Sequence, residues 1–209
     1  MSNEKNRVKT ITYTALFAAL STVLMFWSFP LPFIPPFLKI DLSGVPILLC
    51  AFMFGPVPAL MAVAVKDLIN AAFSTSGGVG ELADFLILGS FAVTAALVYR
   101  KNHTRRGALA ACAAAAGVMV AVGMLANRFL LIPFYMQLMP LEKILSMCAA
   151  VNPLIGSLET YVVFGAGPFN LVKAVLLSAI TFVLYKRLHR LIQREAAPSS
   201  GKAGKAEAE

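Results

Sequence analysis

Six long stretches of apolar residues, separated by short polar or proline-rich stretches, dominate the sequence. They cover approximately residues 11–29, 46–54, 59–73, 82–99, 108–132 and 168–185. A bilayer core is about 30 Å thick and needs ~20 apolar helical residues to cross it, or about 17 at the short end. The pattern therefore predicts an all-α, polytopic membrane protein with six transmembrane helices.

Two of these stretches are predicted to form a tight hairpin. The second is short for a full span, and Gly55-Pro56-Val57-Pro58 separates it from the third. Glycine and proline in such clusters mark turns. We therefore expect a helical hairpin whose spans are tilted or incomplete.

The segment between the fifth and sixth stretches, residues 133–167, is interrupted by proline and glycine. Pro133, Pro140 and Pro153 are too many helix breakers for one span, because proline lacks the amide proton that helix continuation requires. The sequence therefore predicts a long, partly structured external loop between helices 5 and 6. Within it, Leu141 to Val151 is expected to form a short surface helix.

The remaining parts of the chain are two tails. Residues 1–10 are predicted to be a cytoplasmic N-terminal tail, and residues 11–196 the six-helix membrane domain. Residues 197–209 consist of Pro, Ser, Gly, Ala, Lys and Glu, with almost nothing to bury, so a disordered cytoplasmic tail is expected there.

Composition supports a membrane location and excludes several classes. Hydrophobic residues make up 59% of the chain and charged residues 13%, whereas soluble domains have about half and a quarter. The net charge of +8 comes from Lys and Arg placed between apolar runs, not from a stripe that could follow a nucleic-acid backbone, so no nucleic-acid partner is expected. The three cysteines show neither CxxC nor Cys/His spacing, so we expect no metal site and no disulfide framework.

The distribution of basic residues predicts the orientation. Most of the 18 Lys and Arg residues lie before the first stretch, between the fourth and fifth, or after the sixth. Lys39 and Lys143 alone lie in the loops of the other side. Because cytoplasmic loops retain positive charge, we expect both termini to be cytoplasmic.

Ionisable residues at membrane depth are candidates for function, because they cost several kcal/mol unless paired or hydrated. Lys66, Asp67, Arg128 and Lys173 qualify. Lys66 and Asp67 are adjacent and point about 100° apart on a helix, which argues for separate partners. For Lys66, structural pairing and ligand contact both remain open. Arg128 is expected to reach the interface with its head group.

Two asparagines add neutral polar groups. Asn170 and Lys173 are three residues apart and share one helix face, at what is predicted to be the start of the last helix, where free amides could face a ligand. Asn127 offers a donor and an acceptor together, which suits the edge of a uracil-like ring. The alternative role for both asparagines is hydrogen bonding between helices.

Apolar and aromatic side chains surround the predicted external mouth. Phe33, Phe37 and Leu38 lie in the proline-rich loop, and Tyr135, Tyr161 and Phe164 in the long one; the alternative is an interfacial aromatic belt. Gly78 to Ala83 shows G-x-G-x-x-A but lacks the preceding strand of a dinucleotide site. It is interpreted as an external turn with Glu81 near a helix N-terminus.

No catalytic motif occurs in the chain. There is no nucleophile elbow, HExxH or P-loop, so no enzymatic activity is expected. Any energised transport must then draw on an ion gradient or on a separate ATPase.

The stretch from Phe29 to Pro46, FPLPFIPPFLKIDLSGVP, resembles the first external loop of riboflavin-specific S components, the substrate-binding subunits of energy-coupling-factor (ECF) vitamin transporters. Further matching pieces occur in the same order and spread the resemblance over about residues 10–190. They are Phe54-Gly55-Pro56, Gly78 to Ala83, Leu125-Ala126-Asn127, Ile132-Pro133 and Gly167 to Lys173.

The resemblance implies a high-affinity riboflavin site open to the outside of the cell membrane, with riboflavin as transported ligand and no cofactor. It also implies a transmembrane coupling protein and two ATP-binding subunits as partners. The predicted substrate-binding residues are Asn127, Asn170, Lys173, Phe33, Phe37, Leu38, Glu81 and Lys66, with the first loop acting as a lid. Ala15 and Ala19 have the small-xxx-small spacing that permits close helix crossing, and are predicted to contact the coupling protein.

Three positions depart from the family pattern. Gly44, Asp67 and Asp84 stand where the family has Asp, Asn and Asn, which leaves the contacts near them open. Two alternatives therefore stay open: an S component for another vitamin, and a non-transport membrane assembly protein whose polar groups only hold helices together.

Overall fold

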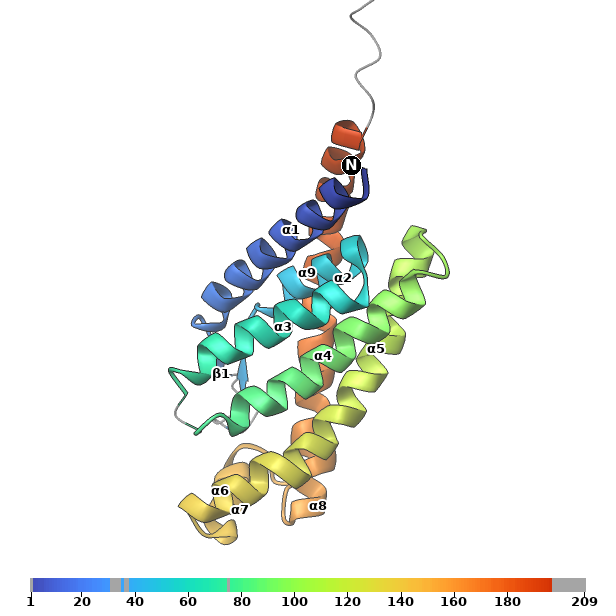
Figure 1. Ribbon diagram of the computed structural model, residues 1–209. Helices are drawn as coiled ribbons and strands as arrows, with labels where there is room; N and C mark the ends of the chain where they lie inside the picture. Colours follow the sequence, from blue (N-terminus) through green and yellow to red (C-terminus); the bar gives the residue numbers. More distant parts are fainter. Residues whose placement is uncertain (1, 31–34, 36–37, 75, 197–209) are drawn as a thin grey trace, which may run out of the picture.

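The computed structural model describes residues 2–30, 35, 38–74 and 76–196, except for the side chains of residues 2, 3, 5, 6 and 186–196. Long helices dominate it (Figure 1). In chain order the elements are α1 (Ser2–Met25), β1 (Phe29–Pro30), β2 (Lys39–Ile40), α2 (Gly44–Phe54), α3 (Pro56–Ala71), α4 (Val79–Tyr99), α5 (Arg105–Ala126), η1 (Asn127–Leu131), α6 (Ile132–Leu138), α7 (Leu141–Val151), α8 (Leu158–Tyr161), η2 (Val162–Ala166) and α9 (Gly167–Ala196).

Four helices in the described part of the chain are long and apolar enough to cross a membrane. They are Arg7–Met25, Val79–Tyr99, Arg105–Leu138 and Leu158–Tyr185. The predicted hairpin forms α2 and α3, and Gly55 turns the chain between them with a φ of 92°. With 11 residues, α2 is about 16 Å long at ~1.5 Å per residue, which is short of a bilayer core.

Both expected boundaries of the loop between the last two spans are wrong. The helix that contains α5 continues to Leu138, and the last span begins at Leu158, so the connection shrinks to residues 139–157. The expected short helix is present as α7. Burial raises the pKa of the Cys148 thiol on α7 to about 11, so Cys148 packs as a small apolar residue.

The reason for these errors is that proline does not end either helix. One π-helical turn, η1, directly precedes Ile132-Pro133, and another, η2, directly precedes Gly167-Pro168. In each, the next amide bonds a carbonyl five residues back, Ile132 to Asn127 and Gly167 to Val162. The wider turn accommodates a residue that has no amide and would clash in a regular helix.

A short β-ribbon adds a feature that the all-α expectation missed. Phe29 pairs with Ile40 and Pro30 with Lys39 in antiparallel register. The ribbon closes the proline-rich loop at its base, and proline is tolerated because each strand of a two-stranded ribbon is an edge. α1 ends at Met25, four residues before the expected end of the first stretch at Phe29 and five before the first proline, Pro30.

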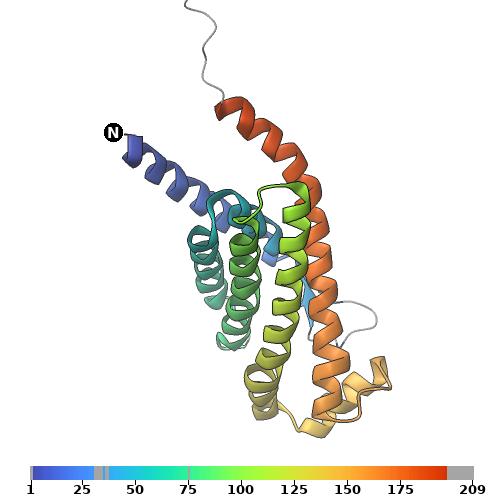
Figure 2. The ribbon, with the colours of Figure 1, turned by 90° about the vertical axis from the view of Figure 1, so that its right-hand side faces the viewer.

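Small residues let the long helices lie close together. α4 and α5 run side by side in Figures 1 and 2, and the buried residues of α5 include Gly107, Ala108, Ala111, Ala115 and Gly123. A side chain at Gly123 would collide with Asn170 of α9. The described ends of the chain, the beginning of α1 and the C-terminal part of α9, lie at the same end of the bundle, and α6, α7 and α8 lie at the other (Figure 1).

Candidate ligand-binding cavity

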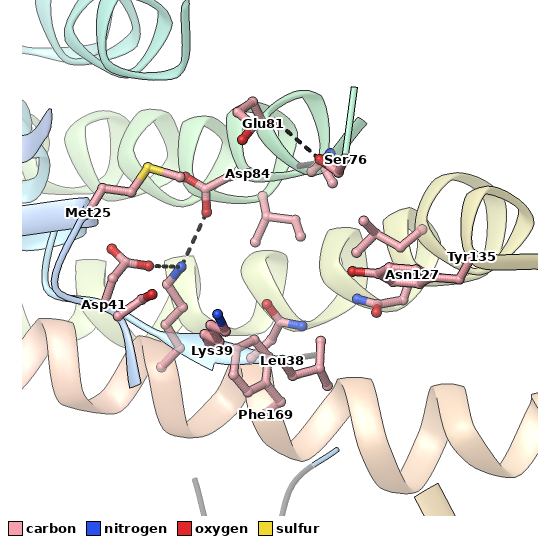
Figure 3. Close-up of a pocket in the computed structure, with 17 residues that line it drawn as sticks. Met25, Leu38, Lys39, Asp41, Ser76, Glu81, Asp84, Asn127, Tyr135 and Phe169 are labelled. Carbon is pink, nitrogen blue, oxygen red and sulfur yellow. Dashed lines mark hydrogen bonds and ion pairs between the residues drawn. The ribbon is translucent and has the colours of Figure 1, made fainter. Parts of the chain in front are cut away.

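A cavity of about 420 Å³ lies in the half of the bundle away from the chain ends. Its walls come from the end of α1, the β-ribbon, the beginning of α4, η1 with α6, and α9. Figure 3 shows the polar side chains of Glu81, Asp84, Asp41 and Asn127 around it, with Phe169 and Leu38 on the apolar side.

Five of the eight predicted substrate-binding residues line this cavity. They are Leu38, Glu81, Asn127, Asn170 and Lys173. Phe33 and Phe37 lie outside the described residues. Lys66 is completely buried but is not part of the wall.

The ammonium of Lys173 is held between two carboxylates. Its Nζ donates hydrogen bonds to Asp41 Oδ2 at 3.0 Å and to Asp84 Oδ1 at 3.2 Å, as the dashed lines in Figure 3 indicate. Pairing is required because a buried ammonium without a counter-charge is costly. An ammonium has three N–H donors, so one remains for a ligand in the cavity.

Asp84 also neutralises Lys66. Lys66 Nζ lies 2.5 Å from Asp84 Oδ2, and the Met25 sulfur lies 3.3 Å away. Asp84 therefore bridges two lysines, one in the cavity wall and one behind it. This bridge gives Asp84 the structural role that the sequence left open.

The expectation that Lys66 and Asp67 do not pair is wrong. Lys66 Nζ lies 2.6 Å from Asp67 Oδ1, although neither Asp67 oxygen accepts an aligned hydrogen bond from the described residues. The backbone directions do diverge, but the flexible four-carbon stem of lysine lets its ammonium reach across. Burial removes the water that would otherwise compete for both charges.

The sequence indicated no role for Asp41. In the structure its carboxylate is held in place by hydrogen bonds from Ser43, two residues further along the chain. The backbone N–H and hydroxyl of Ser43 both donate to Asp41 Oδ1, a local pattern typical of an Asp two residues before a Ser. The Ser21 hydroxyl on α1 donates to the Ser43 carbonyl at 2.5 Å. A continuous set of buried hydrogen bonds thus joins α1 to Lys173.

The two asparagines are each anchored and retain hydrogen-bonding capacity. Asn127 Nδ2 donates to Gly123 O at 2.8 Å, and Asn127 Oδ1 accepts from the Tyr161 hydroxyl at 2.7 Å. Asn170 Nδ2 donates to Ala166 O at 2.8 Å. A primary amide has two N–H donors and a carbonyl with two lone pairs, so in the described contacts each keeps a donor and an acceptor for a ligand.

The expected free helix amides near Asn170 are absent. The helix already begins at Leu158, and the Gly167 amide is bonded to Val162 O. Asn170 and Lys173 therefore lie within a continuous helix, and this helix offers the cavity their side chains and not free backbone amides.

Glu81 is in the first turn of α4, at the positive end of the helix dipole. It accepts hydrogen bonds from Ser74 at 2.7 Å and Ser76 at 3.3 Å. Arg128 lies outside the cavity wall, and its guanidinium pairs with Glu159 on the surface. Among the aromatic candidates, Tyr135 lines the cavity, Tyr161 is buried behind Asn127, and Phe164 is exposed.

Within the described residues, no group of three His, Cys, Asp or Glu side chains is placed to hold a metal ion. A cavity among apolar helices, with anchored amides and a paired ammonium, is typical of a membrane-embedded protein that binds a small polar solute.

Comparison with known proteins defines the class further. The family described as "ECF transporter, substrate-specific component" matches residues 9–185, and the chain belongs to this family. It is thus a substrate-binding component of a membrane transporter and not an enzyme, which confirms the family resemblance and removes the assembly-protein alternative.

Three relatives are similar over most of their length. The riboflavin transporter RibU of Staphylococcus aureus is 34% identical over 192 residues, covering 92% of this chain and 96% of the relative. The riboflavin transporter FmnP of Bacillus subtilis is 23% identical, covering 90% and 96%. RibU of Streptococcus thermophilus is 22% identical, covering 88% and 84%.

A solved structure has the same fold. The S component of a bacterial ECF transporter superposes with a TM-score of 0.72 at 31% sequence identity, covering 90% of this chain and 99% of that one.

Proposed function

We propose that this chain is the high-affinity riboflavin-binding subunit of an ECF vitamin importer. The observation that supports it most is the 34% identity to a riboflavin transporter over 92% of the chain, combined with a cavity where five predicted binding residues converge.

The cavity chemistry fits an uncharged, flat, polar ligand. Its volume of about 420 Å³ is within the ~300–1,000 Å³ range of small-molecule sites. Asn127 and Asn170 retain donor and acceptor groups for a uracil-like ring edge, and Lys173 retains one charged donor for ring or ribityl oxygens. We propose Glu81 and Leu38 as further contacts, and Lys66 as a residue that acts only through Asp84.

The first loop is proposed as the lid. Its base is the β-ribbon. Lys39 of β2 and the residues on either side of this strand, Leu38 and Asp41, line the cavity. Phe33 and Phe37, between the strands, are proposed to cover the ligand.

We propose six membrane crossings with both termini cytoplasmic. α2 and α3 supply the two short crossings, and the described chain ends lie at one end of the bundle, together with the basic connection between α4 and α5 (Figure 2). The cavity then opens to the outside. This orientation follows the retention of basic residues on the cytoplasmic side.

The proposed partners are a transmembrane coupling protein and two ATP-binding subunits. Ala15 and Ala19 are exposed on α1, and Leu16 and Leu20 beside them are also exposed, so a partner helix can approach closely there. Ala15→Trp or Ala19→Trp should impair riboflavin uptake in cells and leave binding by the purified protein nearly unchanged. Normal uptake by both variants would remove these residues from the coupling surface.

The proposed ligand is tested on the purified chain without any ATPase. Riboflavin should bind one to one, measured by quenching of flavin fluorescence and by calorimetry. If high micromolar riboflavin leaves both signals unchanged while another vitamin binds, the chain is an S component for that vitamin.

A further inference from the structure

A second cavity, of about 500 Å³, lies at the other end of α4. The turn between α2 and α3 forms one side and the end of α4 forms the other. Asp84 lines the first cavity and Tyr99 the second, so at about 1.5 Å per residue they lie roughly 22 Å apart along the helix. The second cavity is thus separate from the proposed riboflavin site.

One wall of the second cavity is apolar. Phe52 is buried, and its ring centre lies 4.8 Å from that of Tyr99. Pro56, Val57 and Pro58 continue this wall outward, and Val57 is 66% exposed. The wall therefore offers apolar surface both inside the cavity and at its lip.

The opposite lip is basic. Arg100 and His103 line the cavity. Lys101 is exposed on the same connection, and Arg105 and Arg106 are exposed in the first turn of α5. The sequence has no Asp or Glu between residues 85 and 141. In the described part of the chain, none of these basic side chains forms an ion pair, whereas Lys66, Lys173 and Arg128 do.

This arrangement lies where a phospholipid headgroup would be. The connection from α4 to α5 joins two candidate membrane spans, so it is at the boundary between the apolar layer and water. Basic pockets between transmembrane helices at such boundaries suit anionic headgroups, and the planar guanidinium of arginine matches phosphate geometry. The apolar lip beside Val57 is positioned to contact acyl chains.

We propose that the second cavity binds an anionic phospholipid, with Arg100 and His103 on the phosphate and the Phe52–Pro58 wall against the acyl chains. Inorganic phosphate shares the headgroup chemistry but could not use the apolar wall. The proposal does not depend on the identity of the vitamin.

The test uses the full chain in a mild zwitterionic detergent. Short-chain phosphatidylglycerol, phosphatidylcholine of the same chain length, and inorganic phosphate are titrated separately, and bound lipid is counted by native mass spectrometry. One phosphatidylglycerol should bind in preference to phosphatidylcholine. Arg100→Gln with His103→Gln should weaken this binding about fivefold or more, since an arginine near an anionic lipid surface contributes ~1 kcal/mol.

Arg106→Gln is the control, because it removes a positive charge from the adjoining first turn of α5 but not from the cavity wall. Matching helical circular dichroism and detergent elution establish that the variants fold. The proposal would be overturned by equal binding of the two lipids or by full competition from millimolar phosphate. It would also be overturned if Arg106→Gln lost as much lipid binding as Arg100→Gln with His103→Gln. Riboflavin binding is measured in the same Arg100→Gln and His103→Gln variant and should be retained. A failure of the lipid proposal is then distinguished from a failure of the proposed riboflavin function.

Discussion

The two cavities at the ends of α4 use charge in opposite ways. At the ligand cavity, Lys66 and Lys173 are buried, and each is matched by carboxylates at hydrogen-bonding distance. At the second cavity, Arg100 is exposed and has no carboxylate partner among the described residues. The difference follows from burial: a charge removed from water needs a partner within the fold, whereas a solvated one remains available for binding from outside.

The comparison predicts its largest effect at Asp84, which neutralises both buried lysines. Asp84→Leu should destabilise the protein by about 3–5 kcal/mol, because two lysines lose an acceptor that lipid and protein cannot replace. Thermal unfolding in detergent measures this. Asp84→Asn, which keeps an acceptor oxygen, should lose distinctly less stability. Equal melting temperatures for wild type and Asp84→Leu would contradict the role of the bridge.

The next effect concerns the free donor of Lys173. Lys173→Met should weaken riboflavin binding by roughly ten- to a hundredfold, since a hydrogen bond from a charged donor contributes ~1.5–3 kcal/mol. Stability should also fall, because buried Asp41 loses its counter-charge and keeps only its hydrogen bonds from Ser43, although Asp84 keeps Lys66. Fluorescence titration of folded protein measures the affinity.

Lys66→Met is the control for Lys173, since Lys66 is buried in the same network but is not in the cavity wall. It should change affinity less than Lys173→Met. Asn170→Leu should also weaken binding, and its double mutant with Lys173→Met should lose less than the sum of the single losses, because both side chains are proposed to contact one ligand. Unchanged affinity in Lys173→Met would remove it from the site.

The smallest effect on stability is expected at two glycines, where packing and not charge decides the outcome. A methyl group at Gly44 would lie 2.5 Å from Leu177 Cδ1 and 3.0 Å from Leu88 Cδ1, so Gly44→Ala should cost about 1–3 kcal/mol by overpacking. Gly117→Ala has open space and should stabilise α5 by ~0.5–1 kcal/mol. Opposite shifts in melting temperature test this, and parallel shifts would contradict it.

The sequence predicted the helices and five residues of the cavity wall for a physical reason. Long apolar runs have no alternative in a membrane but to form helices, and polar residues within them, such as Asn127, Asn170 and Lys173, must face a partner or a cavity. Gly55-Pro56 likewise set the hairpin turn locally.

What the sequence did not predict depends on contacts between distant segments. The pairing of Lys173 with Asp41 joins residues separated by 132 positions, and no local pattern indicates it. Pro133 was interpreted as a breaker and Pro168 as the start of the last helix because the effect of proline is local, whereas the π turns that precede them are maintained within a packed bundle. The proximity of Lys66 and Asp67 depended on how far a lysine stem bends.

The π turn η1 has a consequence for how the protein can change over evolutionary time. A π turn corresponds to one residue inserted into a regular helix, and Asn127 is its first residue. Deleting one residue there would let a regular helix form while the helices on both sides keep their positions, and it would change which residues of η1, in place of Asn127 and Leu131, face the cavity. Insertions or deletions in η1 therefore exchange residues of the cavity wall while the flanking helices keep their packing. Ligand specificity can change in this way without a change of fold.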